Sequence, residues 1–356
     1  MPSSIPIADR TPRPQHAAVL PFGAPAIDAM RASILACRPF AMPTETVYGL
    51  AANALCEESV AGIFQAKGRP ANNPLIVHIP DYEAAARLVD LDAAGCVLAR
   101  SFWPGPLTIV ASLRPGSGVS GKVTAGLSTL GVRVPSHPTA QAVLQAAGVP
   151  LAAPSANRSG RISPTSASDV EDELAGRIDL IIDGGTCDIG VESTIVQIDS
   201  RGGVHLLRPG GVPVEAIDAA LTKAGFNGCV TPEPRNADVR LAASAPLVAP
   251  GQLASHYAPR LPVRLDAAAP FMNECLLAFG PLAAPPPTHG WYQLSETGDL
   301  AEAASRLFDG LRTLDRRGAR EGATGIAVAP IPHQGLGAAI NDRLTRAAAP
   351  RDERLP

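Results

Sequence analysis

The 356-residue chain has few aromatic residues, no surplus of positive charge and no cysteine pair of the kind that binds zinc. Aromatic residues make up 4% of the sequence, which argues against a platform on which nucleic-acid bases stack. The formal net charge is -3, so the chain lacks the basic surplus with which general nucleic-acid binders neutralise phosphates. These numbers still permit a local basic pocket.

The six cysteines contain no C-x-x-C pair, so we expect no structural zinc site. They are typical of reduced, small core residues in a cytosolic protein. No run of about 18 apolar residues occurs, which predicts that no segment spans a membrane. The first residues lack the apolar stretch of a signal peptide. We therefore expect a cytoplasmic protein without membrane contacts, in which residues 1–16 form a disordered arm.

Apolar residues make up 46% of the chain, and its length suggests two domains or one large one. Segments that alternate like strands interchange with segments of helical periodicity, and some predicted strands follow one another without a helix between them. The sequence therefore predicts an α/β fold. Its open, twisted sheet should be mixed, with parallel and antiparallel strands, and should carry helices.

A change in composition after Ala224 divides the chain. We predict a larger domain over residues 17–225, a proline-containing linker over 226–260 and a smaller α/β domain over 261–350. In the larger domain we expect strands over 40–43, 74–79, 107–113, 130–134, 150–153, 180–182, 194–198 and 205–207, and helices over 27–35, 59–66, 83–89 and 139–147. In the smaller domain we expect strands over 263–265, 274–279 and 325–329, and helices over 301–315 and 341–348.

Two cations stand at the end of a predicted helix. Lys67 and Arg69 flank Gly68 and precede Pro70, which stops the helix. Such a pair can hold a polyphosphate, with the lysine as a point charge and the arginine as a fork. The same pair can instead stabilise the negative end of the helix dipole. Taken alone, the pair favours this second role.

Residues 154–165 form a second polar segment, dense in serine, glycine and arginine. They follow a predicted buried strand, where α/β proteins commonly place ligand loops. The side chains of Ser155, Asn157 and Ser163 could bind phosphate or ribose there. Alternatively, the segment is an Asn/Ser turn in which Ser163 caps the helix that follows Pro164. The length of the segment favours the ligand loop.

Several single polar residues in predicted strands have two interpretations. Thr44 and Thr46 can bond a ligand amine or hydroxyl, but their β-propensity explains them equally well. His78 is expected to be a structural histidine. Arg133 faces away from its valine neighbours and needs a carboxylate, from a ligand or from the protein. Arg208 either reaches a phosphate or lies at a sheet edge. No Walker A sequence, G-x-G-x-x-G loop or catalytic triad occurs.

Taken together, these motifs resemble those of the threonylcarbamoyl-AMP synthases, in the long form with an added C-terminal domain. The matching segments of the larger domain are 43–50, 67–70, 73–75, 102–108, 132–135, 153–165, 190–194 and 207–210. Residues 250–251 and 256–259 resemble the family's linker, and 335–337 and 341–344 resemble its C-terminal pattern. One departure is that residues 252–255 are not basic, as this part of the family's linker often is.

The resemblance implies a YrdC-like catalytic domain and a smaller Rossmann-like domain. It implies an enzyme, a nucleotidyltransferase, that makes threonylcarbamoyl-AMP and pyrophosphate from L-threonine, bicarbonate and ATP with Mg²⁺. The product would pass to downstream transfer proteins that form threonylcarbamoyladenosine next to the tRNA anticodon. This chemistry needs no protein nucleophile, because the carbamate made from the threonine amine attacks the α-phosphate. The missing triad is therefore consistent with the resemblance.

The resemblance also implies two adjoining pockets. The L-threonine pocket would contain Thr44, His78, Arg133, the backbone of Ala153, Ser193 and Thr194. The ATP pocket would contain Lys67, Arg69, Asn73, Thr129, Ser155, Asn157, Ser163, Arg208 and, from the linker, Tyr257. Lys67 and Arg69 would be catalytic through charge neutralisation. No metal ligand from the chain is implied.

Two other functions fit parts of the sequence. A carbamoyl-transfer protein of hydrogenase maturation contains a related domain, but the cysteine-rich zinc modules of such chains are missing here. A module that binds tRNA or double-stranded RNA would suit a cationic pocket. The acidic net charge and the few aromatic residues disfavour it, so we expect no stable nucleic-acid binding.

Overall fold

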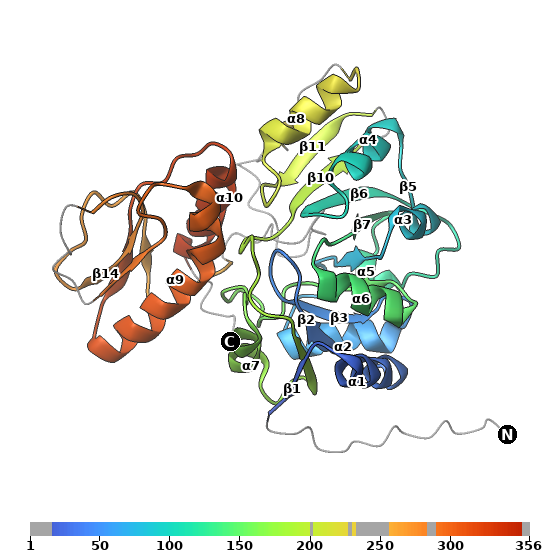
Figure 1. Cartoon of the computed structure of the whole chain (residues 1–356), viewed down its shortest axis with the longest axis horizontal. Coiled ribbons are helices and arrows are strands. Elements are labelled where there is room, and N and C mark those ends of the chain that lie inside the picture. The colour runs from blue at the N-terminus through green and yellow to red at the C-terminus, as the bar shows by residue number, and fades with distance from the viewer. Residues whose placement is uncertain (1–15, 200–201, 227–229, 233–255, 283–289, 351–356) are drawn as a thin grey trace.

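The computed structural model describes residues 16–199, 202–226, 230–232, 256–282 and 290–350. Most of the predicted arm and most of the predicted linker therefore lie outside the described residues. The described part forms a larger domain with one extended sheet and a smaller domain beside it (Figure 1). In the described residues, no helix is both long enough and apolar enough to cross a bilayer.

The larger domain is built on a 12-stranded sheet of the predicted mixed type. The order is β1-β9-β2-β3-β8-β4-β7-β6-β10-β11-β12, and β5 pairs with β6. For example, β4 and β7 run parallel, whereas β6 and β7 run antiparallel. The strands are β1 Ala18–Pro21, β2 Phe40–Met42, β3 Gly49–Asn53, β4 Ile76–His78, β5 Val89–Asp90, β6 Leu107–Leu113, β7 Thr129–Arg133, β8 Leu151–Ala152, β9 Leu180–Asp183, β10 Thr194–Ile198, β11 Val204–Arg208 and β12 Thr231–Pro232.

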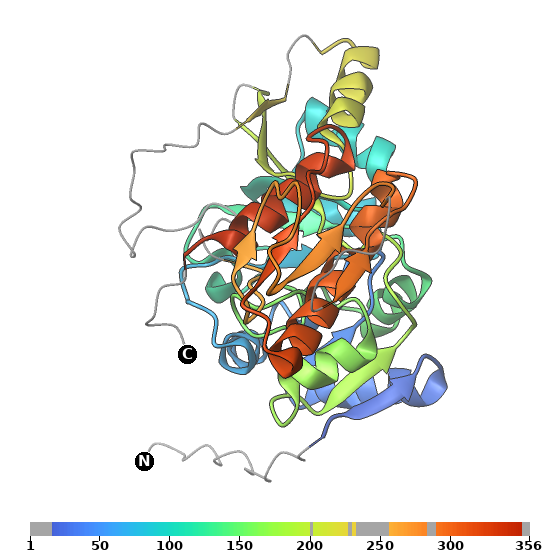
Figure 2. The same ribbon diagram turned by 90° about the vertical axis from the view of Figure 1, so that its left-hand side faces the viewer.

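Helices cover this sheet and bury its apolar residues (Figures 1 and 2). They are α1 Ala24–Leu35, α2 Glu57–Lys67, α3 Tyr82–Leu88, α4 Ala93–Phe102, α5 Gly121–Thr124, α6 Pro138–Ala147, α7 Ala167–Leu174 and α8 Val214–Lys223. The sequence analysis missed α4, α5 and α8, together with the short strands β1, β3, β5 and β12, and it raised α7 only within an alternative, as a helix that follows Pro164. The alternative role of Ser163 as a helix cap is wrong, because α7 begins at Ala167 and Ser166 caps it.

Helix α2 places the predicted cations at the site. It begins with Glu57 and Glu58 in its first turn, and it ends at Gly68, whose φ of 62° puts it in the left-handed region that glycine adopts readily. Lys67 is thus the last helical residue and Arg69 is the first after the cap. Lys67 is also buried, with 3% of its surface exposed, which a helix-capping cation would not be.

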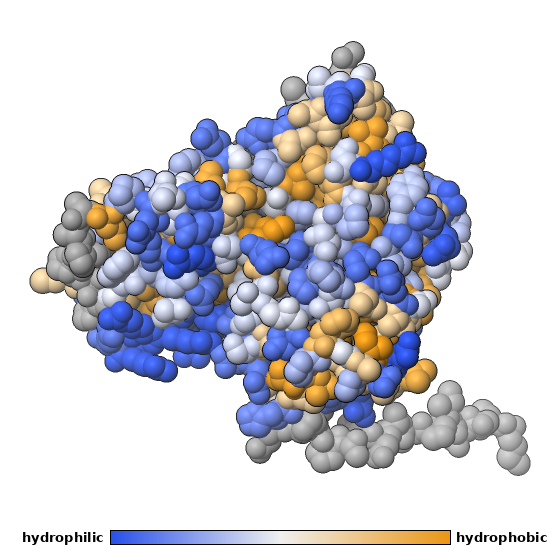
Figure 3. All heavy atoms as spheres, in the orientation of Figure 1, coloured by the Kyte–Doolittle hydropathy of each residue, from blue (hydrophilic) through white to orange (hydrophobic). Residues whose placement is uncertain are grey.

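The smaller domain is a second α/β unit, as predicted. Its four-stranded sheet has the order β13-β16-β14-β15, and every pairing in it is parallel. The elements are β13 Val263–Arg264, β14 Glu274–Ala278, β15 Trp291–Gln293, β16 Gly325–Val328, α9 Leu300–Glu321 and α10 Leu336–Ala348. Both helices lie on the side that faces the larger domain (Figure 1). The solvent face along α9 is mainly hydrophilic (Figure 3).

An apolar cluster crosses the boundary between the domains. Val47, Ile162 and Val191 of the larger domain belong to the same buried cluster as Tyr257 and Phe308. The core of the smaller domain therefore extends to the loops that surround the site. The predicted domain boundaries at residues 225 and 260 remain predictions.

Candidate functional site

A cavity lies where the ends of β4, β7 and β8 meet the loop after β2, the loop before β10 and the end of the linker. Its walls contain nine of the predicted site residues and seven others. They are Thr44, Thr46, Val47, Gly49, Arg69, Ile76, His78, Arg133, Ala153, Pro154, Ser155, Glu192, Ser193, Arg208, His256 and Tyr257.

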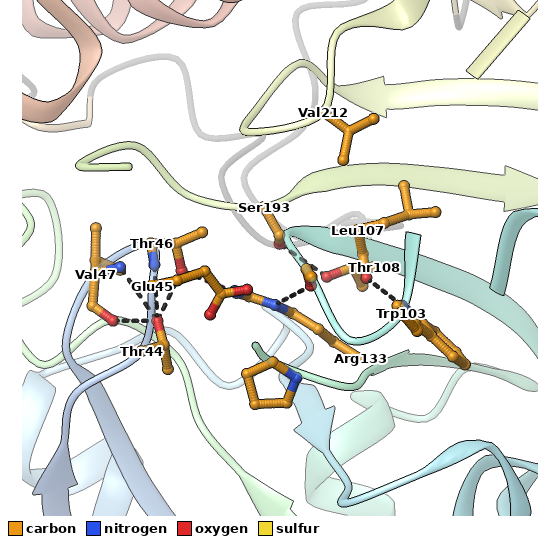
Figure 4. Close-up of polar contacts among 12 residues, drawn as sticks. Thr44, Glu45, Thr46, Val47, Trp103, Leu107, Thr108, Arg133, Ser193 and Val212 are labelled. Carbon is orange, nitrogen blue, oxygen red and sulfur yellow. Dashed lines mark hydrogen bonds and ion pairs between the residues drawn. The ribbon is translucent and has the colours of Figure 1, made fainter. Parts of the chain in front are cut away.

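Hydrogen bonds within the loop after β2 fix one wall of the cavity (Figure 4). The Thr44 hydroxyl donates to the carbonyl of Val47 at 2.6 Å and accepts from the amides of Thr46 and Val47 at 3.2 Å. The Thr46 hydroxyl accepts from Nη1 of Arg133 at 2.9 Å. The loop therefore presents two ordered hydroxyl groups beside an arginine.

Arg133 forms a buried ion pair with Glu45. Nη2 of Arg133 lies 2.7 Å from Oε1 of Glu45, and the two side chains are 4% and 6% exposed. Nε of Arg133 donates to the carbonyl of Gly105 at 3.2 Å. Burial alone would raise the pKa of Glu45, but the charge and the hydrogen bond of Arg133 outweigh it and keep that pKa below its usual value. The carboxylate that Arg133 was predicted to need thus comes from the protein.

His78 supplies an uncharged polar group to the cavity. Its ring nitrogen Nδ1 is buried and has no hydrogen-bond partner in the described structure. Burial and the nearby charge of Arg133 lower the pKa of His78 to about 3. The imidazole is therefore neutral at physiological pH and can bond a ligand at Nδ1. The prediction of a fully satisfied structural histidine does not hold for this nitrogen.

Ser193 and Arg208 form the wall beside β6 and β10. Oγ of Ser193 lies 2.8 Å from Oγ1 of Thr108 and accepts from Nη2 of Arg208 at 3.2 Å. The predicted partner of Ser193, Thr194, does not line the cavity. Its hydroxyl donates to the carbonyl of Val212 at 2.6 Å, which attaches the loop after β11 to the start of β10.

Arg69 and Lys67 bring two more cations to the site, and Arg69 lies near enough to Arg208 for the two charges to interact. Nη2 of Arg69 donates to Oδ1 of Asn73 at 2.6 Å and to the carbonyl of Pro74 at 2.8 Å, and the side chain lines the cavity. Nζ of Lys67 donates to the carbonyl of Ser155 at 2.5 Å and to that of Asn157 at 2.6 Å. Burial, followed by the charge of Arg69, lowers the pKa of Lys67 well below its usual value. Lys67 therefore holds two carbonyls of the ligand loop in place and does not itself line the cavity.

Other predicted residues of the ATP pocket support the loop or lie apart from the cavity. The amide of Asn157 donates to the carbonyls of Arg158 and Arg161, each at 2.8 Å. The hydroxyl of Ser163 donates to Glu192 at 2.6 Å. Thr129 is placed away from this cavity, at the opposite end of β7 from Arg133, where it lines a separate small cavity. The nucleotide role of these residues stays a prediction.

A second buried ion pair, Glu192 with Arg343, was not predicted. Nε of Arg343 in α10 lies 2.7 Å from Oε2 of Glu192, and their side chains are 0% and 8% exposed. Burial alone would raise the pKa of Glu192, but the charges of Arg343 and Arg208 lower it to about 2. Both residues belong to motifs noted in the sequence, but no local pattern could pair residues from two domains.

The end of the linker closes the cavity between the two domains. The ring of Tyr257 stacks on Phe308, with centroids 5.5 Å apart, and the guanidinium of Arg343 lies 5.3 Å from the Tyr257 centroid. The amide of Ala258 donates to the carbonyl of Gly160 at 3.0 Å. Tyr257 therefore reaches the cavity wall, as predicted, and is also 1% exposed within the core of the smaller domain.

Comparisons with known proteins cover both domains. The family described as "Telomere recombination" matches residues 35–210, and the family described as "Threonylcarbamoyl-AMP synthase, C-terminal domain" matches residues 212–349. The chain is 39% identical over 328 residues to the threonylcarbamoyl-AMP synthase of Pyrococcus abyssi, which covers 87% of this chain and 90% of the relative. It is 38% identical over 330 residues to that of Bacillus subtilis, covering 87% and 89%.

A solved structure agrees with these relatives. The crystal structure of Pyrococcus abyssi Sua5 complexed with L-threonine is 35% identical in sequence and superimposes with a TM-score of 0.79, covering 93% of this chain and 96% of that one. The predicted family, fold class and enzymatic nature are therefore confirmed, and the chain belongs to the threonylcarbamoyl-AMP synthase family in its two-domain form.

Proposed function

We propose that this enzyme is a nucleotidyltransferase that makes threonylcarbamoyl-AMP and pyrophosphate from L-threonine, bicarbonate and ATP. The observation that carries the proposal is the composition of the single cavity described above. One side offers Thr44, the neutral His78 and Arg133, whereas the other offers the cations Arg69 and Arg208. The first set suits an amino acid, and the second suits a phosphate chain.

On the L-threonine side, the amine must be neutral before it can form a carbamate. A neutral imidazole can accept a hydrogen bond from an amine or a hydroxyl and adds no positive charge beside it. Glu45 and Thr46 fix the orientation of Arg133, so its guanidinium is held in place before substrate arrives. These groups can position L-threonine by its polar atoms without a protein nucleophile.

On the nucleotide side, the residues neutralise charge. A carbamate oxygen forms a bond to the α-phosphorus of ATP, the bond from that phosphorus to the bridging oxygen breaks, and pyrophosphate leaves with the electron pair. Arg69 and Arg208 lie where they can stabilise the negative charge that develops. Holding the two reactants together can supply about 7–11 kcal/mol of the barrier.

The end of the linker excludes water from the site. Tyr257 and His256 line the cavity and are nearly inaccessible to solvent, with 1% and 7% of their surfaces exposed. A mixed anhydride is labile in water, so a wall of this kind protects the product. We propose that opening of this wall accompanies release of the product.

We keep Mg²⁺ as a proposed companion of ATP. Among the described residues no group of three or more His, Cys, Asp or Glu could hold a metal ion. The two glutamates nearest the cavity, Glu45 and Glu192, are each paired with an arginine. The residues present therefore do not fit a protein-bound Mg²⁺, and its ligands would be phosphate oxygens and water.

The product's chemistry suggests where it goes. We propose that threonylcarbamoyl-AMP passes to transfer proteins that modify adenosine next to the tRNA anticodon, in the cytoplasm. The chain itself would bind the small substrates and form no stable complex with nucleic acid.

The proposed reaction is tested by pyrophosphate release. Purified chain is incubated with ATP and Mg²⁺, and L-threonine or bicarbonate is left out in turn. We expect release that needs both. Release at the same rate without L-threonine would contradict the proposal. Full activity with L-serine in place of L-threonine, together with no response to bicarbonate, would contradict it as well.

A further inference from the structure

A second cavity lies at the junction of the two domains, behind the ligand loop. Its volume is about 480 Å³, and its walls come from residues 158–162, α7, the end of the linker and α9. Among the described residues, six arginines and three acidic residues line it, a local excess of three positive charges in a chain whose net charge is -3. They are Arg158, Arg161, Arg260, Arg312, Arg316 and Arg320, with Asp172, Glu173 and Asp315.

The carboxylates of this cavity already have partners. Each one is engaged with an arginine or with the backbone: Glu173 pairs with Arg158 at 3.3 Å and with Arg312 at 3.8 Å, Asp172 pairs with Arg316, and Asp315 accepts from the amide of Leu261 at 2.8 Å. Their negative charges therefore cannot fully neutralise the positive charge of a further guanidinium.

Arg161 is that further guanidinium. It is half-buried, and among the described residues its side chain has no ion pair or hydrogen bond. Burial lowers its pKa, and the charges of Glu173 and Asp315 act on it against those of Arg158 and Arg260. A partly desolvated guanidinium without a carboxylate partner favours an anion from solution, and its planar fork suits phosphate oxygens.

The two cavities share a wall. Ser155 and Tyr257 line the first, whereas Arg161 and Ala258 line the second. The two segments that carry these residues are joined by the hydrogen bond from the amide of Ala258 to the carbonyl of Gly160. The segments that line the second cavity therefore adjoin the wall of the first.

We propose that the second cavity is a phosphate site that binds inorganic pyrophosphate, the leaving group of the reaction. The phosphate chemistry rests on the arginines, and the choice of pyrophosphate rests on the proposed function. Among the described residues that line the cavity none is aromatic, so they offer no surface on which a nucleobase could stack.

Calorimetric titration of the full chain with inorganic pyrophosphate tests the proposal. We expect two sites. Arg161→Gln should weaken one of them roughly tenfold or more, because one charge-assisted contact is lost. Arg69→Ala should weaken only the other. Arg320→Gln, which removes another arginine of the same cavity, should affect the same site as Arg161→Gln. The control is Arg317→Gln, which removes an arginine of α9 that does not line the cavity and pairs with Glu321.

A single site that ATP displaces and that Arg161→Gln leaves unchanged would overturn the proposal. So would pyrophosphate binding that is unchanged in Arg161→Gln while binding of tRNA falls, because the cavity would then serve a polynucleotide. The outcome is separable from that of the proposed function. Loss of threonine-dependent turnover with two intact sites would count against the synthase reaction alone.

A separate observation concerns two cysteines near the surface. Sγ of Cys37, in the turn after α1, lies 3.1 Å from Sγ of Cys56, the residue that caps α2. Both side chains are partly exposed and are free thiols. Burial would raise the pKa of Cys56, but hydrogen bonds from Ser59 and Cys37 outweigh it and lower that pKa, whereas the pKa of Cys37 is raised, first by its hydrogen bond to Cys56. One thiol of the pair is therefore the better nucleophile.

We infer that Cys37 and Cys56 form a reversible disulfide with a disulfide oxidant such as glutathione disulfide. The Cys56 thiolate attacks a glutathione sulfur and releases one glutathione, and the Cys37 thiolate then attacks the mixed disulfide and releases the second. Two protons and two electrons leave the protein in total. The new bond would join the turn after α1 to the start of α2, the helix that ends at Lys67.

Mass spectrometry of tryptic peptides after treatment with glutathione disulfide tests this inference. Trypsin does not cut between Arg38 and Pro39, so one peptide, residues 32–67, carries both cysteines. We expect this peptide to lose the mass of two hydrogen atoms through an internal Cys37–Cys56 cross-link that dithiothreitol removes, and we expect a stable glutathione adduct on the remaining cysteine of Cys37→Ser. The control is Cys96→Ser, which removes a partly buried thiol that contacts the hydroxyl of Tyr82 at 3.1 Å and should leave the cross-link unchanged. Two separate glutathione adducts on the wild-type chain, without a cross-link, would overturn it.

Discussion

Two buried arginine–glutamate pairs border the cavity, and they differ in what they connect. Arg133 and Glu45 belong to the larger domain, whereas Glu192 lies in the larger domain and Arg343 in α10 of the smaller one. Their closest nitrogen–oxygen distances are both 2.7 Å, and all four side chains are nearly inaccessible to solvent. The same interaction thus shapes a pocket in one place and joins two domains in the other.

The surroundings of the two pairs explain the difference. The charged form of Glu45 is stabilised mainly by Arg133, because the other favourable contacts of Glu45 are with backbone groups. Glu192 also accepts a hydrogen bond from Ser163 and lies near the charge of Arg208. Losing the arginine should therefore cost more at the first pair. Loss of Arg133 should also weaken binding of L-threonine. Loss of Arg343, whose guanidinium lies over the ring of Tyr257, should weaken binding of the nucleotide.

The largest expected effect is that of Arg133→Met. It leaves the carboxylate of Glu45 buried without its counter-ion and should lower the free energy of unfolding by about 3–5 kcal/mol. Urea unfolding in a Trp291→Phe background, in which Trp103 reports on the larger domain, measures this loss. The control is Arg38→Met, which removes an exposed partner of Asp179 and should cost less than about 1 kcal/mol. Equal losses in the two variants would contradict the account.

Arg343→Met should have a somewhat smaller effect and a different signature. We expect a loss of about 3 kcal/mol, because Glu192 keeps Ser163 and the nearby charge of Arg208. ATP affinity should fall while L-threonine affinity stays within about threefold of wild type, as calorimetry of each ligand would show. Arg317→Met, on the neighbouring helix, is the matched control. If both affinities fell equally, the two pairs would not have separate roles.

Arg69→Ala tests a cation whose hydrogen bonds go to Asn73 and Pro74 rather than to a carboxylate. It should lower kcat/KM by an amount equivalent to about 2–3 kcal/mol of transition-state stabilisation, with little loss of stability. Lys67→Ala should lose activity and stability together, because Lys67 is buried and holds two loop carbonyls. Turnover near wild type in Arg69→Ala, with an unchanged circular dichroism spectrum, would restrict Arg69 to a role at the helix end.

The effect of pH is the most widely distributed, because it acts on Glu192 and on the histidines of the cavity, His78 and His256. The folded-state pKa values of His78 and His256 are about 3, below the ordinary value of 6.5, and that of Glu192 is about 2, below 4.5. Depressed values mean that the unfolded chain takes up protons first as the pH falls. Stability should therefore be full above about pH 6.5 and should decrease from there towards pH 3.

The histidine share of this pH dependence can be isolated. His78→Gln should reduce the slope of unfolding free energy against pH between about 6.5 and 5.5, where glutamates of ordinary pKa titrate little. Urea unfolding at a series of pH values gives that slope. Stability that stays constant from pH 7 to pH 5 in the wild-type chain would contradict the assigned protonation states.

The sequence predicted the elements with strong local patterns. The strands at 107–113 and 194–198 have the predicted boundaries because their apolar residues are continuous or alternate clearly. Strand β3, Gly49-Leu50-Ala51-Ala52-Asn53, was missed because small residues and a glycine give little strand signal. Its place between β2 and β8 is set by the sheet and not by its own propensity.

The candidate site was predictable in part. The family's motifs identified most residues of the cavity wall, and strand alternation showed that Arg133 needs a carboxylate. The partner, Glu45, could not be identified, because the turn that brings it to Arg133 depends on the hydrogen bonds of Thr44. The Glu192–Arg343 pair depends on how two domains pack, for which a single sequence has no local signal. The same packing buries Tyr257, which was predicted only to reach the nucleotide.

The central claim, that one cavity joins L-threonine, bicarbonate and ATP, is tested most directly by mass spectrometry of the product. The chain is incubated with ATP, Mg²⁺, L-threonine and ¹³C-bicarbonate. The account predicts threonylcarbamoyl-AMP that carries one ¹³C atom, together with an equal amount of pyrophosphate. Threonyl-AMP without the labelled carbon, or no adenylate at all from a folded chain that binds both ATP and L-threonine, would contradict it.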